Sequence, residues 1–171
     1  MAAEGRIDGR RVSLRSLHEA DLAIIDAWYE EAARAAFEER EVEELGCQGA
    51  ESAGLLAILR ADEDEPIGLL EYKVNEGWMA VRFIGLAKAH RGWGYGSEAV
   101  RLLEEWALRE RIAQRFRAEV DVRNGLGLYF WLRLGYRPAG LGELGSHDEG
   151  EAARMAMVRM VAGPGESAPG F

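Results

Sequence analysis

The sequence predicts one α/β domain of the α+β type, with a mixed, largely antiparallel central sheet of about six or seven strands flanked by helices. Segments with the two-residue period of half-buried strands alternate with segments that have the 3.6-residue period of amphipathic helices. An acidic turn also joins two neighbouring strands as a hairpin, which does not fit a doubly wound parallel sheet. A chain of 171 residues suits a single domain, which we place at 1–162. The tail 163–171 has loop composition and is predicted to be disordered.

The N-terminal part is predicted to form a strand and two helical segments. Val12 and Leu14 alternate with polar residues in the strand, residues 10–17. Ser16 and Glu19 have the spacing of a capping box, so a helix is expected to follow directly. The apolar positions of this helix recur at helical spacing: Leu22, Ile25, Tyr29 and Ala32. An acidic helical segment then covers 37–45 and ends in a loose stretch, 46–54.

The middle of the chain is predicted to form three strands. Residues 55–60 and 66–74 read as a hairpin joined by the turn 61–66, and a longer strand covers 78–87. This last strand runs directly into a glycine-rich stretch. The sequence therefore places that stretch between a strand and a helix.

The C-terminal part continues with two helices and three strands. The helices cover 96–109 and 126–135, and the strands cover 116–122, a short segment beginning at Tyr136, and 153–160. Residues 140–151 form a flexible acidic loop before the last strand.

Composition excludes several classes of function. The chain carries a formal net charge of −9, whereas a nucleic-acid binder needs a basic face. Its apolar runs are too short for a membrane span, and its first residues lack the apolar core of a signal peptide. The single cysteine, Cys47, allows neither an internal disulfide nor a CxxC zinc site, and the three histidines have no metal-like spacing, so no metal is expected. We expect a cytoplasmic protein without nucleic-acid or membrane partners, and the sequence leaves a homodimer open.

Three glycines at alternate positions, Gly92, Gly94 and Gly96, stand immediately before the helix 96–109. Each costs backbone entropy, so a turn or an approaching ligand must require them. One interpretation is a tight structural turn. A second is a dinucleotide fingerprint, because Gly94, Gly96 and Ala99 fit G-x-G-x-x-G/A with an acidic residue about twenty positions later. That fingerprint normally belongs to the first strand–helix unit of its fold, whereas here it lies past mid-chain.

A third interpretation is a pyrophosphate cradle for coenzyme A at a helix N-terminus. Successive unhindered amides and the positive end of the helix dipole bind anions without many charged side chains. This interpretation reconciles a phosphorylated ligand with the acidic composition. It also explains the glycines, because side chains there would keep the backbone away from the phosphates.

The same stretch resembles a known family. "RGWGYG" (91–96) fits the R/Q-x-x-G-x-G/A signature of the GNAT superfamily of acetyl-CoA-dependent N-acetyltransferases. "AEVDVRN" (118–124) resembles the family's LEVxxxN strand, and "WLRLGY" (131–136) resembles its YEKLGF ending. The opening "VSLRSLHEADL" (12–22) is similar to the first strand and helix of the ribosomal-protein and aminoglycoside acetyltransferase branches. Together these motifs cover about residues 11–160 in the family's order, and they imply a GNAT-like sheet.

The resemblance implies transfer of an acetyl group from acetyl-CoA directly to a primary amine, of a small cationic molecule or of a protein N-terminus. It also assigns the residues that contact the coenzyme. Leu86, Ala87 and Lys88 would lie along the pantetheine arm, where a splay or bulge exposes main-chain N–H groups that polarise the thioester carbonyl. Arg91, Gly92, Trp93, Gly94, Tyr95, Gly96 and Ser97 would hold the pyrophosphate, Asn124 would hydrogen-bond the pantetheine, and Trp131 would pack near it.

Two departures from the family pattern concern the chemistry. Trp131 stands where the family usually has the tyrosine that protonates the departing thiolate, and an indole N–H is no practical acid. Tyr129 is two residues away, about 200° around a helix, so it cannot simply substitute. The strand 78–87 carries no acidic residue, and Arg82 stands roughly where some relatives have one. The candidate base is Glu71 on the preceding strand, with Glu119 or Asp121 on the following strand as alternatives. A water chain to solvent is an equal alternative.

Two classes of function stay open. One is the acetyltransferase, and the other is a regulatory domain that binds acetyl-CoA or another nucleotide without efficient turnover. The absent tyrosine favours the second. For the first, the acidic segments 30–44 and 140–151 would attract a cationic amine, although solvated helix faces also explain such charge.

Overall fold

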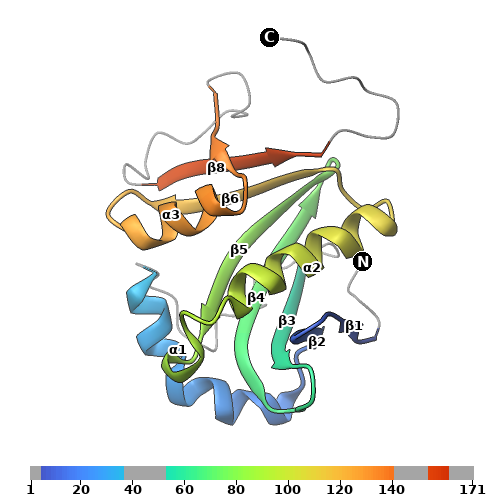
Figure 1. Ribbon diagram of the computed structural model, residues 1–171, viewed down its shortest axis with the longest axis vertical. Coiled ribbons are helices and arrows are strands. Elements are labelled where there is room, and N and C mark those ends of the chain that lie inside the picture. Colours follow the sequence, from blue (N-terminus) through green and yellow to red (C-terminus); the bar gives the residue numbers. More distant parts are fainter. Residues whose placement is uncertain (1–4, 37–52, 141–153, 162–171) are drawn as a thin grey trace.

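The computed structural model describes residues 5–36, 53–140 and 154–161. These residues form one eight-stranded sheet with the order β1-β2-β3-β4-β5-β6-β8-β7 (Figure 1). The strands are β1 (Ile7–Asp8), β2 (Val12–Ser16), β3 (Ala53–Arg60), β4 (Pro66–Asn75), β5 (Trp78–Leu86), β6 (Arg115–Asp121), β7 (Arg137–Pro138) and β8 (Arg154–Met160). The helices are α1 (Leu22–Ala35), α2 (Tyr95–Arg109) and α3 (Gly125–Arg133).

The predicted fold class is confirmed. Every neighbouring pair of strands is antiparallel except β5 and β6, which are parallel and are connected through α2. The sheet has eight strands rather than about six or seven. The additional strand is β1, whose two residues are too short to show a period in the sequence.

The helices cover opposite faces of the sheet, and alternation along β4 shows which side chains each face buries. Leu69 belongs to a cluster with Ile25 and Phe83 under α1. Leu70, its neighbour in sequence, belongs to the larger cluster that α2 and α3 cover. α2 crosses that second face, with α3 beside it next to β6 (Figure 1). The first seven residues of β4 are therefore buried, with side chains packed on both faces of the sheet.

The start of α1 differs from the predicted capping box. Ser16 is the last residue of β2, and a short 3₁₀ turn precedes the helix. Asp21, rather than Glu19, accepts the main-chain N–H of His18 at 2.8 Å. The same carboxylate receives two hydrogen bonds from Arg15, at 2.6 and 2.9 Å, and these lower the pKa of Asp21. The capping box therefore lies two residues later than predicted, at His18 and Asp21, where Asp21 is buried together with Arg15.

Several sequence predictions fall outside the described residues: the acidic segment 37–45, Cys47, most of the loop 140–151, His147 and the tail 163–171. Within the part of the chain that is described, no helix is long and apolar enough to cross a membrane. Nor does a group of three or more potential metal ligands occur among those residues.

The feature that positions the site is a fork between the two parallel strands. β5 pairs with β6 from Trp78 to Val81 only, and the last pair is Val81 with Ala118. On its other side, β5 pairs with β4, and this pairing shifts register at Arg82. Tyr72 of β4 pairs with Val81 and its neighbour Glu71 pairs with Phe83, so Arg82 is an extra residue in β5. A bulge bends a strand and strengthens its twist. Beyond Arg82, β5 therefore diverges from β6 and leaves a gap in the sheet.

Candidate active site

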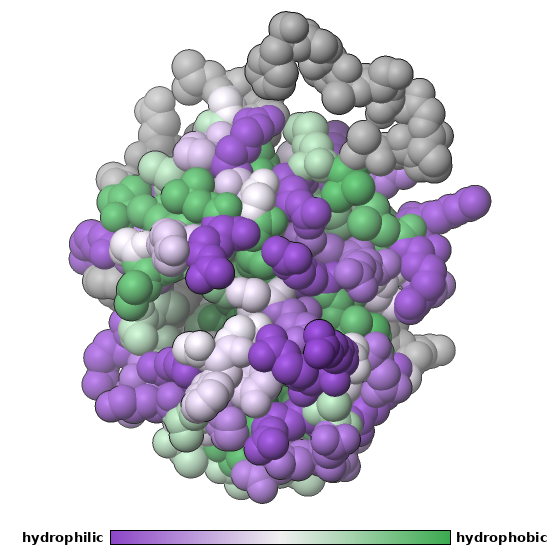
Figure 2. Space-filling model, viewed as in Figure 1, coloured by the Kyte–Doolittle hydropathy of each residue, from purple (hydrophilic) through white to green (hydrophobic). Residues whose placement is uncertain are grey.

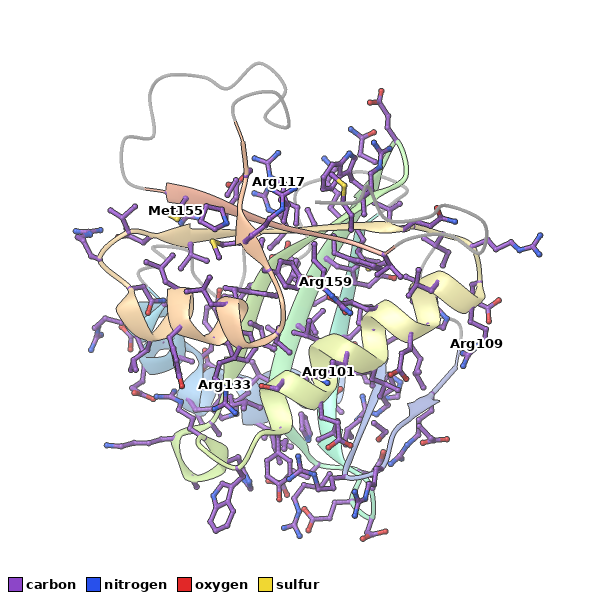
Figure 3. All side chains as sticks on the ribbon, turned by 45° about the horizontal axis from the view of Figure 1, so that its top comes forward. Arg101, Arg109, Arg117, Arg133, Met155 and Arg159 are labelled. Carbon is purple, nitrogen blue, oxygen red and sulfur yellow. The ribbon has the colours of Figure 1, made fainter. Side chains whose placement is uncertain are left out.

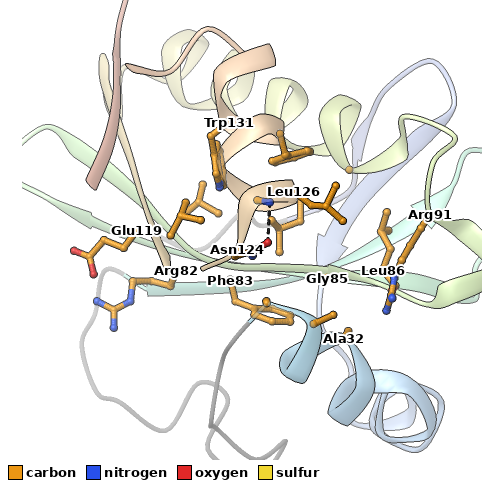
Figure 4. Close-up of a pocket in the computed structure, with 18 of the residues that line it drawn as sticks. Ala32, Arg82, Phe83, Gly85, Leu86, Arg91, Glu119, Asn124, Leu126 and Trp131 are labelled. Atoms are coloured by element: carbon orange, nitrogen blue, oxygen red, sulfur yellow. Dashed lines mark hydrogen bonds between the residues drawn. The ribbon is translucent and has the colours of Figure 1, made fainter. Parts of the chain in front are cut away.

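A cleft of about 410 Å³ occupies the gap between β5 and β6 (Figure 4). Its walls come from the second half of β5, the end of β6, the first turns of α3 and the last turn of α1. Apolar surface dominates, and Asn124 is one of the few polar side chains along it. Such a cleft, apolar with a few directed polar groups, has the character of a small-molecule site.

Main-chain groups of β5 face this cleft. The N–H of Ala87 donates to the carbonyl of Ile67 at 2.9 Å, so Ala87 turns its polar groups toward β4. Main-chain directions alternate along a strand, and Ile84 and Leu86 therefore turn theirs toward the fork. β6 has already diverged there and cannot pair with them. The splay expected from the family resemblance is thus present, and it presents the amides of Ile84 and Leu86 to the cleft.

The glycine loop follows directly. Gly92 and Gly94 have φ angles of 81° and 83°, in the left-handed region that side chains disfavour. Gly94 is the N-cap of α2. The first amides of the helix, from Tyr95 to Ser97, have no partner within the helix and point toward the loop. Glycines at 92 and 94 therefore allow a turn that ends with helix amides aimed at one place.

A second cleft, of about 670 Å³, continues past the loop between α2 and α3. It shares Leu86, Arg91, Gly92, Gly96 and Phe130 with the first cleft, so the two form one continuous path. Figure 2 shows this face of the molecule, with hydrophobic surface over α3 bordering a hollow.

Two arginines in the second cleft were missed by the sequence analysis. Arg101 of α2 and Arg133 of α3 both line it, and they lie on neighbouring helices (Figure 3). Neither forms a hydrogen bond or an ion pair with a carboxylate among the described residues, although Arg101 is close enough to Glu104 to act on its pKa. Sequence could not single them out, because their meeting depends on how α2 and α3 are arranged in space. These two arginines give the second cleft positive charge, although the chain as a whole is acidic.

Arg11, another arginine near the loop, is neutralised by a carboxylate. Arg11 of the N-terminal segment donates through its main chain and its Nε to Glu98 of α2, at 2.6 and 2.8 Å, and through Nη1 to the carbonyl of Trp93 at 2.9 Å. Burial raises the pKa of Glu98, but the hydrogen bonds from Arg11 outweigh it, and the pKa lies below its ordinary value. The carboxylate therefore remains charged and paired. Arg11 thus fixes the outer side of the loop to the beginning of the chain.

Arg91, predicted to hold pyrophosphate, points its side chain toward α1. Two nearly parallel hydrogen bonds of 2.9 and 2.7 Å join its guanidinium to Glu31, and its Nε donates to the carbonyl of Leu86 at 2.8 Å. The hydrogen bonds from Arg91 lower the pKa of Glu31. Arg91 still lines both clefts, but this side chain ties α1 to the end of β5.

The other residues predicted to contact the coenzyme differ in which cleft they line. Leu86, Gly92 and Gly96 line both clefts, whereas Trp93, Gly94 and Ser97 line the second. Tyr95 begins α2 and lies under the guanidinium of Arg11, 5.5 Å from the ring centroid. Ala87 and Lys88 line neither cleft. Most of the predicted set is therefore brought together around one path.

Asn124 and Trp131 lie on the opposite wall, on α3. Asn124 is the N-cap of α3, and its side-chain oxygen accepts the N–H of Gly127 at 2.8 Å, which leaves its amide nitrogen as the free donor. Trp131 is 5% exposed and has its ring 4.7 Å from that of Tyr136, whose hydroxyl donates to Glu104. Tyr129 is 59% exposed, so it does not replace the missing tyrosine.

The three candidate bases differ in position. Glu71 is buried on the α1 face of β4 and lines neither cleft. Asp121 accepts three hydrogen bonds from Arg123, and these hold its pKa at about 2, too low for a base at neutral pH. Glu119 lines the cleft and accepts a hydrogen bond from Arg117 at 2.6 Å. Of these three carboxylates, Glu119 alone lines the cleft.

Comparison with known proteins gives the family to which this fold and its forked cleft belong. The sequence model of the acetyltransferase (GNAT) family matches residues 22–136. This match covers more than half of the chain, and the protein belongs to the GNAT acetyltransferase family. A comparison with curated protein sequences gave no match.

Solved structures share the fold at low sequence identity. An acetyltransferase from Salmonella typhimurium, which modifies the N-terminal serine of 50S ribosomal subunit protein L7/L12, aligns with a TM-score of 0.71 at 16% identity, over 92% of this chain and 100% of that one. A probable GNAT-family acetyltransferase from Chromobacterium violaceum aligns with a TM-score of 0.69 at 23% identity, over 91% of this chain and 84% of that one. The ribosomal L7/L12 alpha-N-protein acetyltransferase RimL, in complex with coenzyme A, aligns with a TM-score of 0.66 at 16% identity, over 92% of this chain and 98% of that one. At these identities the likeness establishes the fold.

Proposed function

We propose that the protein transfers an acetyl group from acetyl-CoA to a primary amine, of a small molecule or of a protein N-terminus, by direct attack while both substrates are bound. The observation that carries this proposal is the fork between β5 and β6, which presents unpaired main-chain amides beside a loop that ends in helix amides. Family membership supports the same reaction. Neither the fork nor the loop alone would distinguish acyl transfer from nucleotide binding.

The residues present fit acetyl-CoA along the whole path. The loop around Gly92 and Gly94, with the first amides of α2, is a concave site for the pyrophosphate. Arg101 and Arg133 are placed to meet a further phosphate in the second cleft. The narrower apolar cleft between β5 and α3 suits the uncharged pantetheine arm, with the amide nitrogen of Asn124 as a donor. Acetyl-CoA would supply the acetyl group as a thioester at the inner end of this path.

The chemistry required of the protein is modest. The acceptor must lose one proton before its nitrogen attacks the carbonyl carbon. The carbon–sulfur bond then breaks, and the products are an amide, a free thiol and one proton. The amides of Ile84 and Leu86 would stabilise negative charge on the carbonyl oxygen, because they are fixed by the sheet and face the cleft. A thiol with a pKa near ~8.5 leaves as the thiolate without an acid, so Trp131 need not transfer a proton.

A second candidate is a regulatory domain that binds acetyl-CoA or another nucleotide without efficient turnover. Trp131 favours it, because this buried indole occupies the position of the family's tyrosine and the described part of α3 offers no substitute facing the cleft. The two candidates predict the same coenzyme binding. They differ only in whether thiol is released when an amine is added.

Calorimetry with acetyl-CoA and with NADH, followed by thiol release against a panel of amines, tests the proposal. We expect saturable binding of acetyl-CoA, no binding of NADH at the same concentrations, and amine-dependent release of free thiol. Binding of acetyl-CoA without thiol release for any amine would support the regulatory alternative. Preferential binding of NADH would contradict the proposed acetyl transfer and favour a domain that binds another nucleotide, with the dinucleotide interpretation of the loop.

A further inference from the structure

The acceptor end of the cleft begins at Arg82 and Glu119. The last paired residues of the fork are Val81 and Ala118, so Arg82 and Glu119 are the first residues beyond it on their respective strands. Because β5 and β6 are parallel there, the two residues lie across the gap from each other. Both line the cleft, and Figure 4 shows their side chains extending from the same end of it.

This end lies away from the coenzyme's phosphates. Phe116, Ala118 and Val120 of β6 belong to the hydrophobic cluster under α2 and α3. Side chains alternate along a strand, so Glu119 projects to the other face, on the side of α1. The loop of Gly92 and Gly94 stands at the start of α2, at the opposite end of the path. An acceptor reaching the thioester from the α1 side would therefore meet Arg82 and Glu119.

The two side chains carry opposite charges that are available to a ligand. Arg82 is exposed, and it has no hydrogen bond or ion pair with any residue in the described ranges. Most other arginines that line the cleft or stand beside it are paired, including Arg91 with Glu31 and Arg117 with Glu119. The Glu119 side chain is 34% exposed, and one oxygen accepts the hydrogen bond from Arg117. The second oxygen can accept a hydrogen bond from a bound ammonium group.

We propose that Arg82 and Glu119 select an acceptor that carries a carboxylate close to its amine. This inference rests on the proposed acetyl transfer and assigns its substrate class. Glu119 receives the ammonium group and takes part in removing its proton, whereas the guanidinium of Arg82 forms a planar pair with the carboxylate. Two sources share this chemistry: a free α-amino acid, and a peptide N-terminus followed by an acidic residue. An acceptor with a second cation near its amine is disfavoured, because that cation would face Arg82.

The inference differs from the expectation of a cationic acceptor. That expectation rested on acidic segments that lie largely outside the described residues, whereas Arg82 and Glu119 are inside the cleft itself. The net charge of a protein acts mainly on the rate of encounter with a charged substrate. Groups that touch the acceptor decide which acceptor is retained. The cleft residues therefore outweigh the net charge as evidence for the substrate class.

The test compares acceptors that differ only in the carboxylate. Leucine, leucinamide and 3-methylbutylamine share a side chain and carry, respectively, a carboxylate, a neutral amide and neither group. A peptide with aspartate at its second position is compared with the same peptide carrying asparagine. We expect kcat/KM to be roughly 10- to 100-fold higher for the carboxylate member of at least one pair, mainly through KM, because charge-assisted hydrogen bonds have about this value. The pair that shows the preference identifies the source.

Variants assign the preference to Arg82. Arg82→Gln should remove it while acetyl-CoA affinity stays unchanged, and Arg82→Lys should restore part of it. Arg109→Gln, at the exposed far end of α2, is the matched control and should leave the preference intact. Calorimetry with coenzyme A present gives a second readout that does not require turnover, and we expect carboxylate-dependent binding that Arg82→Gln abolishes.

Two results would overturn the inference: equal kcat/KM and binding within every pair, or a preference that Arg82→Gln does not change. Either one could occur in a protein that still binds acetyl-CoA and acetylates amines. Failure of the inference is therefore distinguishable from failure of the proposed function.

Discussion

In the proposed reaction, the two ends of the cleft would bind their ligands with different parts of the chain. At the loop end, main-chain amides at the start of α2 would form the site, and the ion pairs Arg11–Glu98 and Arg91–Glu31 lie beside the loop. At the acceptor end, the site consists of the side chains Arg82 and Glu119. The backbone of the loop must adopt one conformation, so few substitutions are tolerated there. The acceptor end can change its specificity through single side chains without altering the fold.

The largest effect expected at the loop end follows from Gly94→Val. At a φ of 83°, a β-branched residue is strained, and its Cβ would stand 3.1 Å from the guanidinium of Arg11. We expect the loop to shift and acetyl-CoA binding by calorimetry to fall below detection, while circular dichroism shows a folded protein. Gly125→Ala is the control, because its added Cβ would meet nothing within 4 Å and its φ is ordinary, so affinity should stay unchanged. A folded Gly94→Val protein with wild-type affinity would remove the loop from the coenzyme site.

A smaller effect separates the two roles open to Arg91. If its guanidinium acts as a strut between Glu31 and the carbonyl of Leu86, Glu31→Ala should lower acetyl-CoA affinity by roughly two- to fivefold, in the range of exposed ion pairs. Arg91→Ala should have a similar effect, and the double variant should lose little more. Glu30→Ala, next on α1 and paired with Arg34, is the control. A rise in affinity for Glu31→Ala would instead show that the freed guanidinium binds phosphate.

The smallest effect is expected at Trp131. Its ring packs between those of Phe130 and Tyr136, and a proton-transfer role is not required of it. Trp131→Phe should therefore change kcat little and lower the Tm modestly through lost packing, whereas Trp131→Tyr should keep or raise kcat. General acid catalysis contributes roughly 10²–10⁴-fold, so a restored acid would be visible wherever thiolate departure limits the rate. A large loss of kcat in Trp131→Phe, at unchanged acetyl-CoA affinity and Tm, would show that the indole takes part in the reaction.

The contrast between the loop end and the acceptor end also explains which features could be predicted from the sequence. The glycines of the loop are local signals, because a positive φ and a helix N-terminus are encoded within a few residues around Gly92 and Gly94. The mixed sheet was also predictable, since the two-residue period of strands and the 3.6-residue period of helices can be recognised within short segments. The fork was expected from the family resemblance alone, because residue patterns reveal neither the bulge at Arg82 nor the point where the pairing of β5 with β6 stops. Arg101, Arg133 and Glu31 likewise come to the site through helix packing, and the choice of Glu71 as base could not account for its burial on β4.

The most direct test of the central claim is a backbone amide NMR titration with acetyl-CoA. The claim is that one continuous path binds the coenzyme, with phosphates at the loop and the thioester in the fork between β5 and β6. The account predicts saturable shifts of the amides of Gly92 to Ser97 and of Ile84 and Leu86, with a common Kd. Shifts confined to the loop would place the thioester outside the fork and contradict the proposed role of Ile84 and Leu86. Shifts at neither place, in a protein that binds acetyl-CoA, would contradict the site altogether.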